Sequence, residues 1–227
     1  IFRIKDPNMR ERMFNHALSQ VLNYQLKLNL YQKAQKKKLW VNEENTFLNN
    51  QITIGVLGVG YIGKFVGNEL KKLNYNIIGY KKSLNKSKYS FKIFTGQQIS
   101  KFISSSDIII SILPSTKESE NFINEKFFKR MKKNSLLINI GRGLTLNEED
   151  LINHLKTNYN FFVSLDVFKK EPLVKNHKFW THPNIVITPH VAAITDINSS
   201  IDYMYKRFLS ISKNQKIKSD VNLIKGY

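Results

Sequence analysis

One glycine-rich stretch limits the fold of this chain more than any other feature. Gly58, Gly60 and Gly63 form the pattern Gly-x-Gly-x-x-Gly. An apolar run over residues 52–57 precedes the pattern, and apolar residues at helical spacing follow it over residues 62–73. This order predicts a strand, a tight turn and a helix, which together hold the pyrophosphate of a dinucleotide. A glycine-rich turn without a ligand is the alternative, but the flanking strand and helix favour the dinucleotide site.

Each position of the glycine motif has a physical task in such a site. Gly58 permits the sharp turn, Gly60 lets a pyrophosphate approach the backbone, and Gly63 lets the helix pack closely on the strand. Tyr61 and Ile62 lie between the last two glycines, where the free N–H groups and the positive dipole end of the helix attract an anion. We therefore treat these five residues as candidates for cofactor binding.

The composition of the chain excludes several classes of protein. With 227 residues, of which 41% are hydrophobic, the chain can form one large or two small domains with a sizeable core. It has no cysteine, which excludes disulfides, thiolate metal sites and cysteine nucleophiles. No apolar run reaches the roughly 18 residues that a membrane span needs, and no signal-peptide pattern opens the sequence. We expect a soluble cytoplasmic protein with no membrane partner and no bound metal.

The net charge is strongly positive. Lys and Arg total 36 against 17 for Asp and Glu, which gives a formal net charge of +19. Such an excess is compatible with a basic regulatory protein or one that associates with nucleic acid. The lysines are scattered among many Asn and Ile residues, however, as an AT-rich coding sequence would produce. We therefore favour an account without a nucleic-acid partner and keep the other as an alternative.

The first part of the chain has a helical pattern over residues 6–36. Asp6 and Pro7 form a typical helix start. An apolar stripe follows at spacings of three and four, made of Met9, Met13, Ala17, Val21, Tyr24 and Leu28. A helix of this length is compatible with a bridge between domains or between the subunits of a homodimer. We expect Trp40 to anchor the polar linker that follows over residues 41–51.

From residue 52 onward, strand and helix patterns alternate. Short apolar runs predict strands at residues 52–57, 76–80, 107–113, 135–140, 161–165 and 184–188. Helical patterns occupy residues 62–73, 97–103, 123–132, 147–157 and 196–213. This alternation predicts an α/β fold with a doubly wound parallel sheet, a Rossmann NAD(P)-binding domain whose ligand lies at the carboxyl ends of the strands. The expected division is a helix and linker over 1–48, the nucleotide-binding domain over 49–195, and a helix and tail over 196–227.

The end of the second predicted strand bears on the choice of cofactor. Chains that prefer NAD carry an acid there, which binds the ribose hydroxyls. Here the segment reads Tyr80, Lys81, Lys82 and Ser83, with no acid to repel a 2′-phosphate and with two cations and a hydroxyl to hold one. We expect NADP(H) to be preferred over NAD(H). The alternative is that both lysines belong to the general lysine excess.

Three polar residues follow the last three predicted strands. Arg142 follows the fourth strand, Glu171 the fifth and His190 the sixth. An arginine can bind the carboxylate of a 2-oxo acid, and a protonated histidine can give a proton to the carbonyl oxygen during hydride transfer. A neighbouring carboxylate holds the imidazole and favours its charged form. Singly, each has an ordinary structural explanation, as a loop cap, a surface ion pair or a core histidine. Together, they favour catalysis.

Several motifs in the sequence carry a family resemblance. Besides the glycine motif they are Ile112–Thr116, Asn139–Gly143, Leu165–Phe168 with Glu171-Pro172, and Thr188–Ala193. In these motifs the chain resembles the D-isomer-specific 2-hydroxyacid dehydrogenases. The resemblance implies that Arg142 binds the substrate carboxylate of a small 2-oxo acid, and that Glu171 is the partner of His190, the proton donor. It also implies that five residues line the nicotinamide end of the cofactor, namely Leu113, Pro114, Ile140, Asp166 and Ala193.

Finer details resemble the glyoxylate and hydroxypyruvate reductases of this family. They are residues 2–3 with Asp6, residues 19–22, residues 189–195 and the terminal residues 226–227. The resemblance implies NADPH-dependent reduction of glyoxylate to glycolate and of hydroxypyruvate to glycerate. An arginine that NADP-dependent members carry near the second strand falls here on Lys82, which keeps the charge but loses the bidentate fork.

Members of this family carry a first domain ahead of the helix at 6–36. It has about a hundred residues by ordinary domain size, and it closes over the cofactor. Ile1 falls where the middle of such a protein would be, so we expect either a fragment or a gene that has lost its first third. The apolar face of the helix at 196–213 would then lack its partner. The alternative function is a truncated, non-catalytic nucleotide-binding remnant or scaffold.

Overall fold

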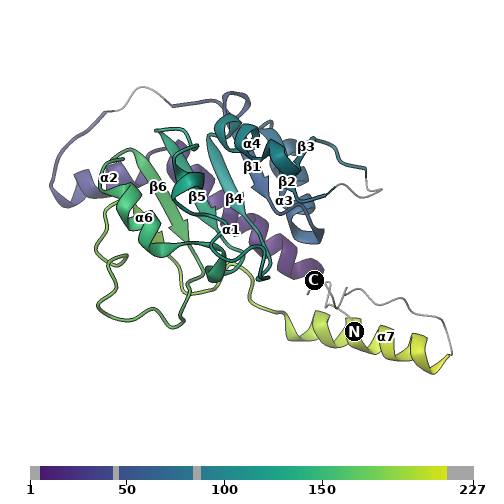
Figure 1. The fold of residues 1–227 in the computed structure, drawn as a ribbon. Helices are drawn as coiled ribbons and strands as arrows, with labels where there is room; N and C mark the ends of the chain where they lie inside the picture. Colours follow the sequence, from purple (N-terminus) through teal and green to yellow (C-terminus); the bar gives the residue numbers. More distant parts are fainter. Residues whose placement is uncertain (1–5, 43–45, 84–87, 214–227) are drawn as a thin grey trace.

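A seven-stranded parallel sheet forms the centre of the molecule (Figure 1). The computed structural model describes residues 6–42, 46–83 and 88–213. The strand order is β3-β2-β1-β4-β5-β6-β7. The chain therefore adds β2 and β3 on one side of β1 and then adds β4 to β7 on the other side, so the strand order reverses between β1 and β4. In open sheets of this kind the ligand crevice lies at that reversal, outside the carboxyl ends of the strands. The strands are β1 (Thr53–Leu57), β2 (Asn76–Lys81), β3 (Lys92–Thr95), β4 (Ile108–Ser111), β5 (Ser135–Asn139), β6 (Phe161–Leu165) and β7 (Ile185–Ile187).

The doubly wound parallel sheet predicted from the sequence is confirmed. Six of its strands lie where apolar runs predicted them, to within one or two residues at each end. The prediction missed β3, which has only four residues and pairs with β2 alone at the edge of the sheet. Its first residue, Lys92, is exposed, so β3 lacks the continuous apolar run of a buried strand.

Two helices cover one face of the sheet. They are α1 (Pro7–Gln25) and α3 (Tyr61–Lys72). Met13, Ala17 and Val21 of α1 share a buried cluster with Val66 and Leu70 of α3 and with the strands beneath them. Residues 7–25 are therefore packed on the sheet as α1. The domain limits predicted from the sequence remain a prediction.

The opposite face is covered by three shorter helices. They are α4 (Ile99–Ser105), α5 (Glu125–Phe128) and α6 (Glu148–Leu155). Their buried side chains form the second apolar cluster with the strands. Asn147 caps α6 by accepting a hydrogen bond from Asp150 N, and the three acids of its first turn suit the positive end of the helix dipole. Short 3₁₀ turns lie at Asn49–Gln51, Gly96–Gln98 and Gly143–Thr145.

The prediction of one continuous helix over residues 6–36 is wrong. Asp6 caps α1 as expected, but the helix ends at Gln25, and a second helix, α2, covers Leu28–Lys36. Lys27 between them has a φ of 55°, which is left-handed backbone and cannot continue a right-handed helix. Leu28 is therefore 42% exposed, although it continues the apolar stripe in the sequence. The expected anchor, Trp40, is 99% exposed.

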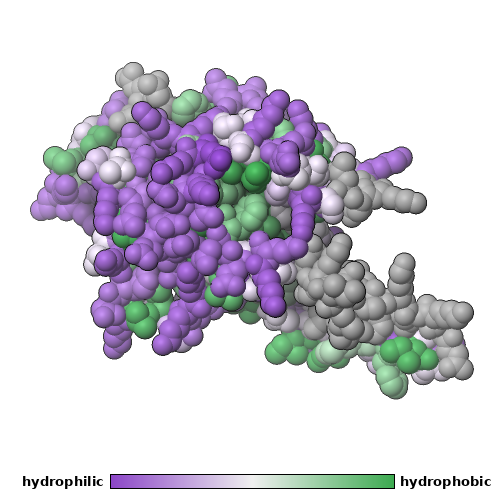
Figure 2. Space-filling model, viewed as in Figure 1, coloured by the Kyte–Doolittle hydropathy of each residue, from purple (hydrophilic) through white to green (hydrophobic). Residues whose placement is uncertain are grey.

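The last described helix, α7 (Ile197–Ser212), stands apart from the sheet (Figure 1). Its N-terminus is capped by Asp196, which accepts a hydrogen bond from Ser199 N. Hydrophobic side chains gather along it, whereas the side of the body seen in Figure 2 is mostly hydrophilic. Six apolar or aromatic residues of α7 are each more than half exposed, namely Ile197, Ile201, Met204, Tyr205, Phe208 and Ile211.

Within the described ranges, no helix combines the length and the apolar character that a bilayer crossing requires. The family resemblance at residues 2–3 and 226–227 lies outside the described residues, as does part of the predicted linker.

Candidate active site

The glycine loop connects β1 to α3 at the crevice. Gly58 has a φ of +100°, a conformation that side chains rarely adopt, and a Cβ there would lie 2.8 Å from Ile112 O. A Cβ on Gly63 would lie 2.2 Å from Gly58 O. Both positions therefore exclude any side chain, for the reasons of turn geometry and close helix packing that the motif predicts.

The space beside Gly60 differs from that beside the other two glycines. Gly60 is the N-cap of α3, so the unpaired N–H groups of the first helical turn follow it. Among the described residues, and apart from Gly60 and its immediate backbone neighbours, no heavy atom lies within 4 Å of the position that a Cβ on Gly60 would take. Open space next to a helix N-terminus fits a phosphate group. The loop can therefore accommodate the pyrophosphate of a dinucleotide, and the helix start offers donors for it.

The end of β2 presents its four candidate residues differently. The Tyr80 side chain packs in the core, where its ring is tilted against that of Phe102 and its hydroxyl donates to Gly96 O at 2.9 Å. Burial raises the pKa of Tyr80, although Lys82 acts in the opposite direction. Lys81 Nζ donates to Tyr89 Oη at 2.9 Å. Lys82 and Ser83 are both exposed.

An acid lies near the end of β2 after all. Lys82 Nζ is 2.5 Å from Glu118 Oε1, in an ion pair whose side chains are 67% and 62% exposed. Glu118 belongs to the segment that follows β4, 36 residues further along the chain. The strand end itself has no acid, as the sequence shows, but the fold brings one to it. This carboxylate competes with any anion for the charge of Lys82.

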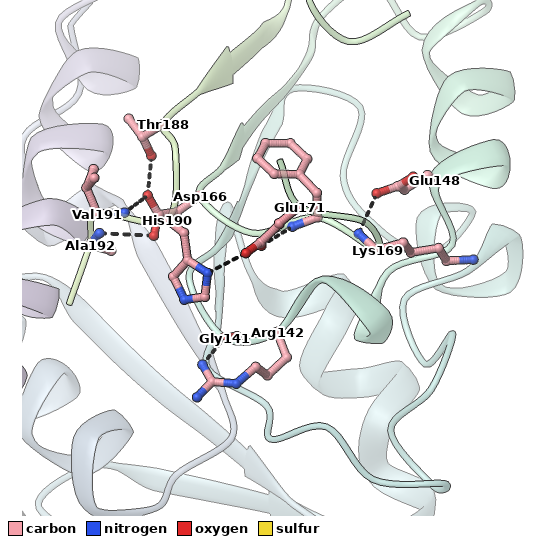
Figure 3. Close-up of polar contacts among 11 residues, drawn as sticks. Gly141, Arg142, Glu148, Asp166, Lys169, Glu171, Thr188, His190, Val191 and Ala192 are labelled. Carbon is pink, nitrogen blue, oxygen red and sulfur yellow. Dashed lines mark hydrogen bonds and ion pairs between the residues drawn. The ribbon is translucent and has the colours of Figure 1, made fainter. Parts of the chain in front are cut away.

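Arg142, Glu171 and His190 follow three neighbouring strands. They come after β5, β6 and β7, which are adjacent and parallel, so all three lie at the carboxyl edge of the sheet. The Arg142 side chain is exposed, and its Nη1 donates to Gly141 O at 2.7 Å. Its backbone is held by Thr145, whose Oγ1 donates to Arg142 O at 2.7 Å. Figure 3 shows the Arg142 guanidinium on the same side of the sheet edge as the His190 ring.

Glu171 and His190 are in direct contact. Glu171 Oε2 lies 2.7 Å from His190 Nδ1, and Phe168 N donates to Glu171 Oε1 at 2.9 Å (Figure 3). Partial burial raises the pKa of Glu171, but the hydrogen bonds from His190 and Phe168 outweigh burial and hold that pKa below its usual value. Glu171 is therefore ionised at neutral pH and orients the ring, with Nδ1–H facing the carboxylate and Nε2 left to face a substrate.

A buried carboxylate, Asp166, holds the loop that carries His190. Asp166 is 1% exposed and accepts hydrogen bonds from Val191 N at 2.9 Å and Ala192 N at 3.0 Å. Its backbone oxygen accepts from His190 N at 2.8 Å. Thr188 Oγ1 donates to Asp166 Oδ1 at 2.5 Å. These four contacts fix the backbone on both sides of His190, whose φ of 55° is left-handed and strained for a residue with a side chain.

The other residues predicted for the nicotinamide end lie at neighbouring strand ends. Ile140 is buried beneath the edge, and Ala193 packs against the same cluster. Leu113 is partly buried and approaches the loop after β5, where a Cβ on Gly141 would lie 2.7 Å from Leu113 O. Pro114 O accepts a hydrogen bond from Ser119 Oγ at 2.5 Å. Contact of these residues with a cofactor remains a prediction.

Two residues of this network were missed by the sequence analysis. Thr188 binds Asp166, and His16 Nε2 lies 3.1 Å from Thr188 Oγ1 and 3.8 Å from Asp166 Oδ1. Burial lowers the pKa of His16, and Asp166 raises it only in part. His16 is 172 residues from Thr188 in the sequence. The one available signal was its place three residues after Met13, beside the apolar stripe of α1.

The chain is similar to proteins of one enzyme family. The model of the D-isomer specific 2-hydroxyacid dehydrogenase NAD binding domain matches residues 18–192. A glyoxylate/hydroxypyruvate reductase A from Serratia proteamaculans is 32% identical over the whole chain, which covers 72% of that relative. A protein of the same name from Photorhabdus laumondii is also 32% identical, with the same coverage.

Solved structures agree with this similarity. A D-isomer specific 2-hydroxyacid dehydrogenase from Xanthobacter autotrophicus, in complex with NADPH and MES, superimposes with a TM-score of 0.93 at 26% identity, covering the whole of this chain and 93% of that one. An NADPH-dependent glyoxylate/hydroxypyruvate reductase from Sinorhizobium meliloti, in complex with NADP and sulfate, gives a TM-score of 0.93 at 25% identity and is covered over 72% of its chain. With its nucleotide-binding sheet and the family model matched over residues 18–192, the chain belongs to the D-isomer specific 2-hydroxyacid dehydrogenase family.

Proposed function

We propose that this chain is the cofactor-binding part of an NADPH-dependent reductase, which converts glyoxylate to glycolate and hydroxypyruvate to glycerate. The observation that carries the proposal is the pair of His190 Nδ1 and Glu171 Oε2 at 2.7 Å, at the same carboxyl edge of the parallel sheet as the glycine loop. The names of its relatives supply the substrates, since two that are 32% identical are called glyoxylate/hydroxypyruvate reductase A.

His190 is the proposed proton donor of this reaction. When bound, the reduced nicotinamide supplies a hydride to the carbonyl carbon of the 2-oxo acid. The carbonyl oxygen then develops negative charge and needs a proton, which His190 gives from Nε2. Glu171 accepts the hydrogen bond from Nδ1–H and holds the ring in place, which leaves Nε2 to face the substrate.

Arg142 is the proposed ligand of the substrate carboxylate. Its guanidinium has donors in a planar fork that matches a carboxylate. The side chain is exposed, and its hydrogen bond to Gly141 O occupies only one of its nitrogens, Nη1. Binding the carboxylate this way orients the carbonyl toward His190 and polarises it, which is a large part of catalysis in such reactions.

NADP(H) is the proposed cofactor, in preference to NAD(H). Lys81 and Lys82 at the end of β2 supply positive charge where the 2′-phosphate of the adenosine ribose would lie. Similar proteins from Xanthobacter autotrophicus and Sinorhizobium meliloti have been solved with NADPH and NADP. Separate titrations with NADPH and NADH test the preference, and tighter binding of NADH would refute it.

An activity measurement tests the whole proposal. NADPH oxidation is followed with glyoxylate and with hydroxypyruvate, using this chain and a longer protein in which the N-terminal part of the Serratia relative precedes it. We expect turnover in the longer protein and loss of turnover in its Arg142→Gln variant. If the longer protein folds and binds NADPH but reduces neither 2-oxo acid, the proposal is wrong.

A second candidate is nucleotide binding without catalysis. The observation that favours it is the exposure of the site, because the side chains of His190 and Glu171 are 47% and 34% exposed and water reaches both. This candidate predicts saturable NADPH binding, read from cofactor fluorescence, with no 2-oxo acid reduced even by the longer protein.

A further inference from the structure

His16 of α1 lies behind the loop that carries His190. Its side chain is 11% exposed, and Nε2 is 3.1 Å from Thr188 Oγ1. This contact joins a helix on one face of the sheet to the segment that follows β7. Neither Arg142 nor Glu171 contacts His16 in the bonds described above, so the proposed reaction leaves this residue without a task.

The hydrogen bonds around Thr188 fix where the protons lie. Thr188 has one hydroxyl proton, which it donates to Asp166 Oδ1 at 2.5 Å. Its oxygen can therefore only accept from His16, so His16 Nε2 carries a proton and donates it. Across the described residues, the buried Nδ1 of His16 has no hydrogen-bond partner. A buried N–H without an acceptor costs more free energy than a buried ring nitrogen without a donor. The tautomer with an unprotonated Nδ1 is therefore the more stable one at this position.

This arrangement bears on the geometry of His190. Asp166 Oδ1 accepts from both Thr188 and Val191, and Asp166 Oδ2 accepts from Ala192 N. The left-handed backbone of His190 is unfavourable for a residue with a side chain, so neighbouring contacts must offset its cost. A Thr188 hydroxyl that rotated away from Asp166 would free the carboxylate to shift, and the two backbone donors would shift with it.

We propose that His16 is a positioning residue, whose Nε2–H holds the Thr188 hydroxyl toward Asp166 and thereby fixes the loop that presents His190. The consequence for catalysis rests on the proposed function. The positioning itself is a property of the protein without ligand, and it can be measured whether or not the protein reduces a 2-oxo acid.

Two substitutions at His16 test the proposal on the 227-residue chain. His16→Leu removes the donor at similar size, whereas His16→Gln keeps an amide N–H that can reach Thr188. Amide hydrogen exchange at Val191 and Ala192 is measured by NMR, with amides of β4 as an internal reference for global opening. We expect exchange at the two loop amides to speed up about tenfold in His16→Leu and to stay within about twofold of the parent in His16→Gln. The matched control is Asn15→Leu, at the neighbouring exposed position of α1.

Three results would overturn the proposal. One is unchanged exchange at Val191 and Ala192 in His16→Leu. Another is an equal acceleration at the loop and at β4 that His16→Gln does not rescue, since that describes loss of packing alone. The third comes from the parent protein and does not depend on a variant that folds. The ring nitrogen shifts of His16 should show the tautomer protonated at Nε2, and a proton on Nδ1 alone would contradict the assignment.

Discussion

The two ends of the nucleotide crevice are built in contrasting ways. At the His190 end, Asp166 is buried, and its carboxylate accepts from Thr188, Val191 and Ala192. At the β2 end, Lys82 is exposed and holds an exposed carboxylate, that of Glu118. The first region is held by short hydrogen bonds inside the protein, whereas the second is held by an ion pair that is exposed to water.

This contrast has an energetic meaning. A buried hydrogen-bonded carboxylate is costly to disturb, because its partners lose bonds that water cannot replace. Exposed ion pairs contribute about 0–1 kcal/mol and rearrange easily. We infer that the chemical end keeps its geometry whether or not a ligand is present, and that the ribose end adjusts to the charge of whatever binds. Substitutions should therefore have large effects at the first end and small ones at the second.

The largest effect is expected for His190→Gln in the longer protein described above. Its turnover of glyoxylate should fall by about 10³-fold, because the proposed proton donor is lost. The dissociation constant of NADPH should stay within about twofold, since the glycine loop is untouched. His177→Gln is a suitable control, because His177 also lies near a glutamate, Glu148, at 3.6 Å. A variant that keeps a tenth of the parent activity would show that His190 is not the donor.

The next effect is one on stability. Asp166→Asn places an amide where a carboxylate accepts from Val191 N and Ala192 N, so at least one N–H loses its acceptor or faces another donor. We expect the free energy of unfolding in urea to fall by about 3 kcal/mol. Asp202→Asn, at an exposed position of α7, should change it by less than about 0.5 kcal/mol. A loss at Asp166 no larger than that of the control would refute the account of the loop.

A smaller effect is expected at the ribose end. Lys81→Gln removes a charge beside the proposed 2′-phosphate, and we expect the dissociation constant of NADPH to rise about tenfold. That of NADH, which lacks the phosphate, should stay unchanged. Lys156→Gln, at the exposed end of α6, controls for the loss of one positive charge. Equal weakening of NADPH and NADH would mean that Lys81 does not discriminate between them.

The smallest effect has the opposite sign. Glu118→Gln removes the carboxylate that neutralises Lys82, so NADPH should bind about threefold more tightly. Fluorescence titration at low and at physiological ionic strength should show the gain shrinking with salt. Glu120→Gln, two residues further on and also exposed, should leave binding unchanged. Weaker binding by Glu118→Gln would place Glu118 among the residues that support the cofactor.

Local patterns in the sequence were sufficient for most of the fold. Buried strands such as β1 and β5 are continuous apolar runs, and the glycine motif marks the turn between β1 and α3. The edge strand β3 was not predicted, because most of its residues are partly exposed and they do not form a continuous apolar run. The break at Lys27 was not predicted, because neither glycine nor proline marks this left-handed position in the sequence.

For the site, the sequence predicted that Arg142, Glu171 and His190 follow successive strands, and the structure has them after β5, β6 and β7 at one edge of the sheet, while their roles remain predictions. The contact between Glu171 and His190 followed from the family resemblance, and the structure has it at 2.7 Å. The bonds of His16 with Thr188 and of Lys82 with Glu118 could not be foreseen, since 172 and 36 residues separate the partners. Such pairs depend on how helices and loops meet in space, which no local pattern encodes.

One titration tests the central claim that a nicotinamide nucleotide lies across the strand ends with its reactive ring beside His190. The chain has five histidines, which makes their ring signals easy to follow by NMR. Adding NADPH to saturation should shift the ring signals of His190 while leaving those of His154 and His177, which pack beside Phe161 and Phe179, unchanged. Saturable binding that leaves His190 unmoved, or no binding at millimolar NADPH, would contradict the account.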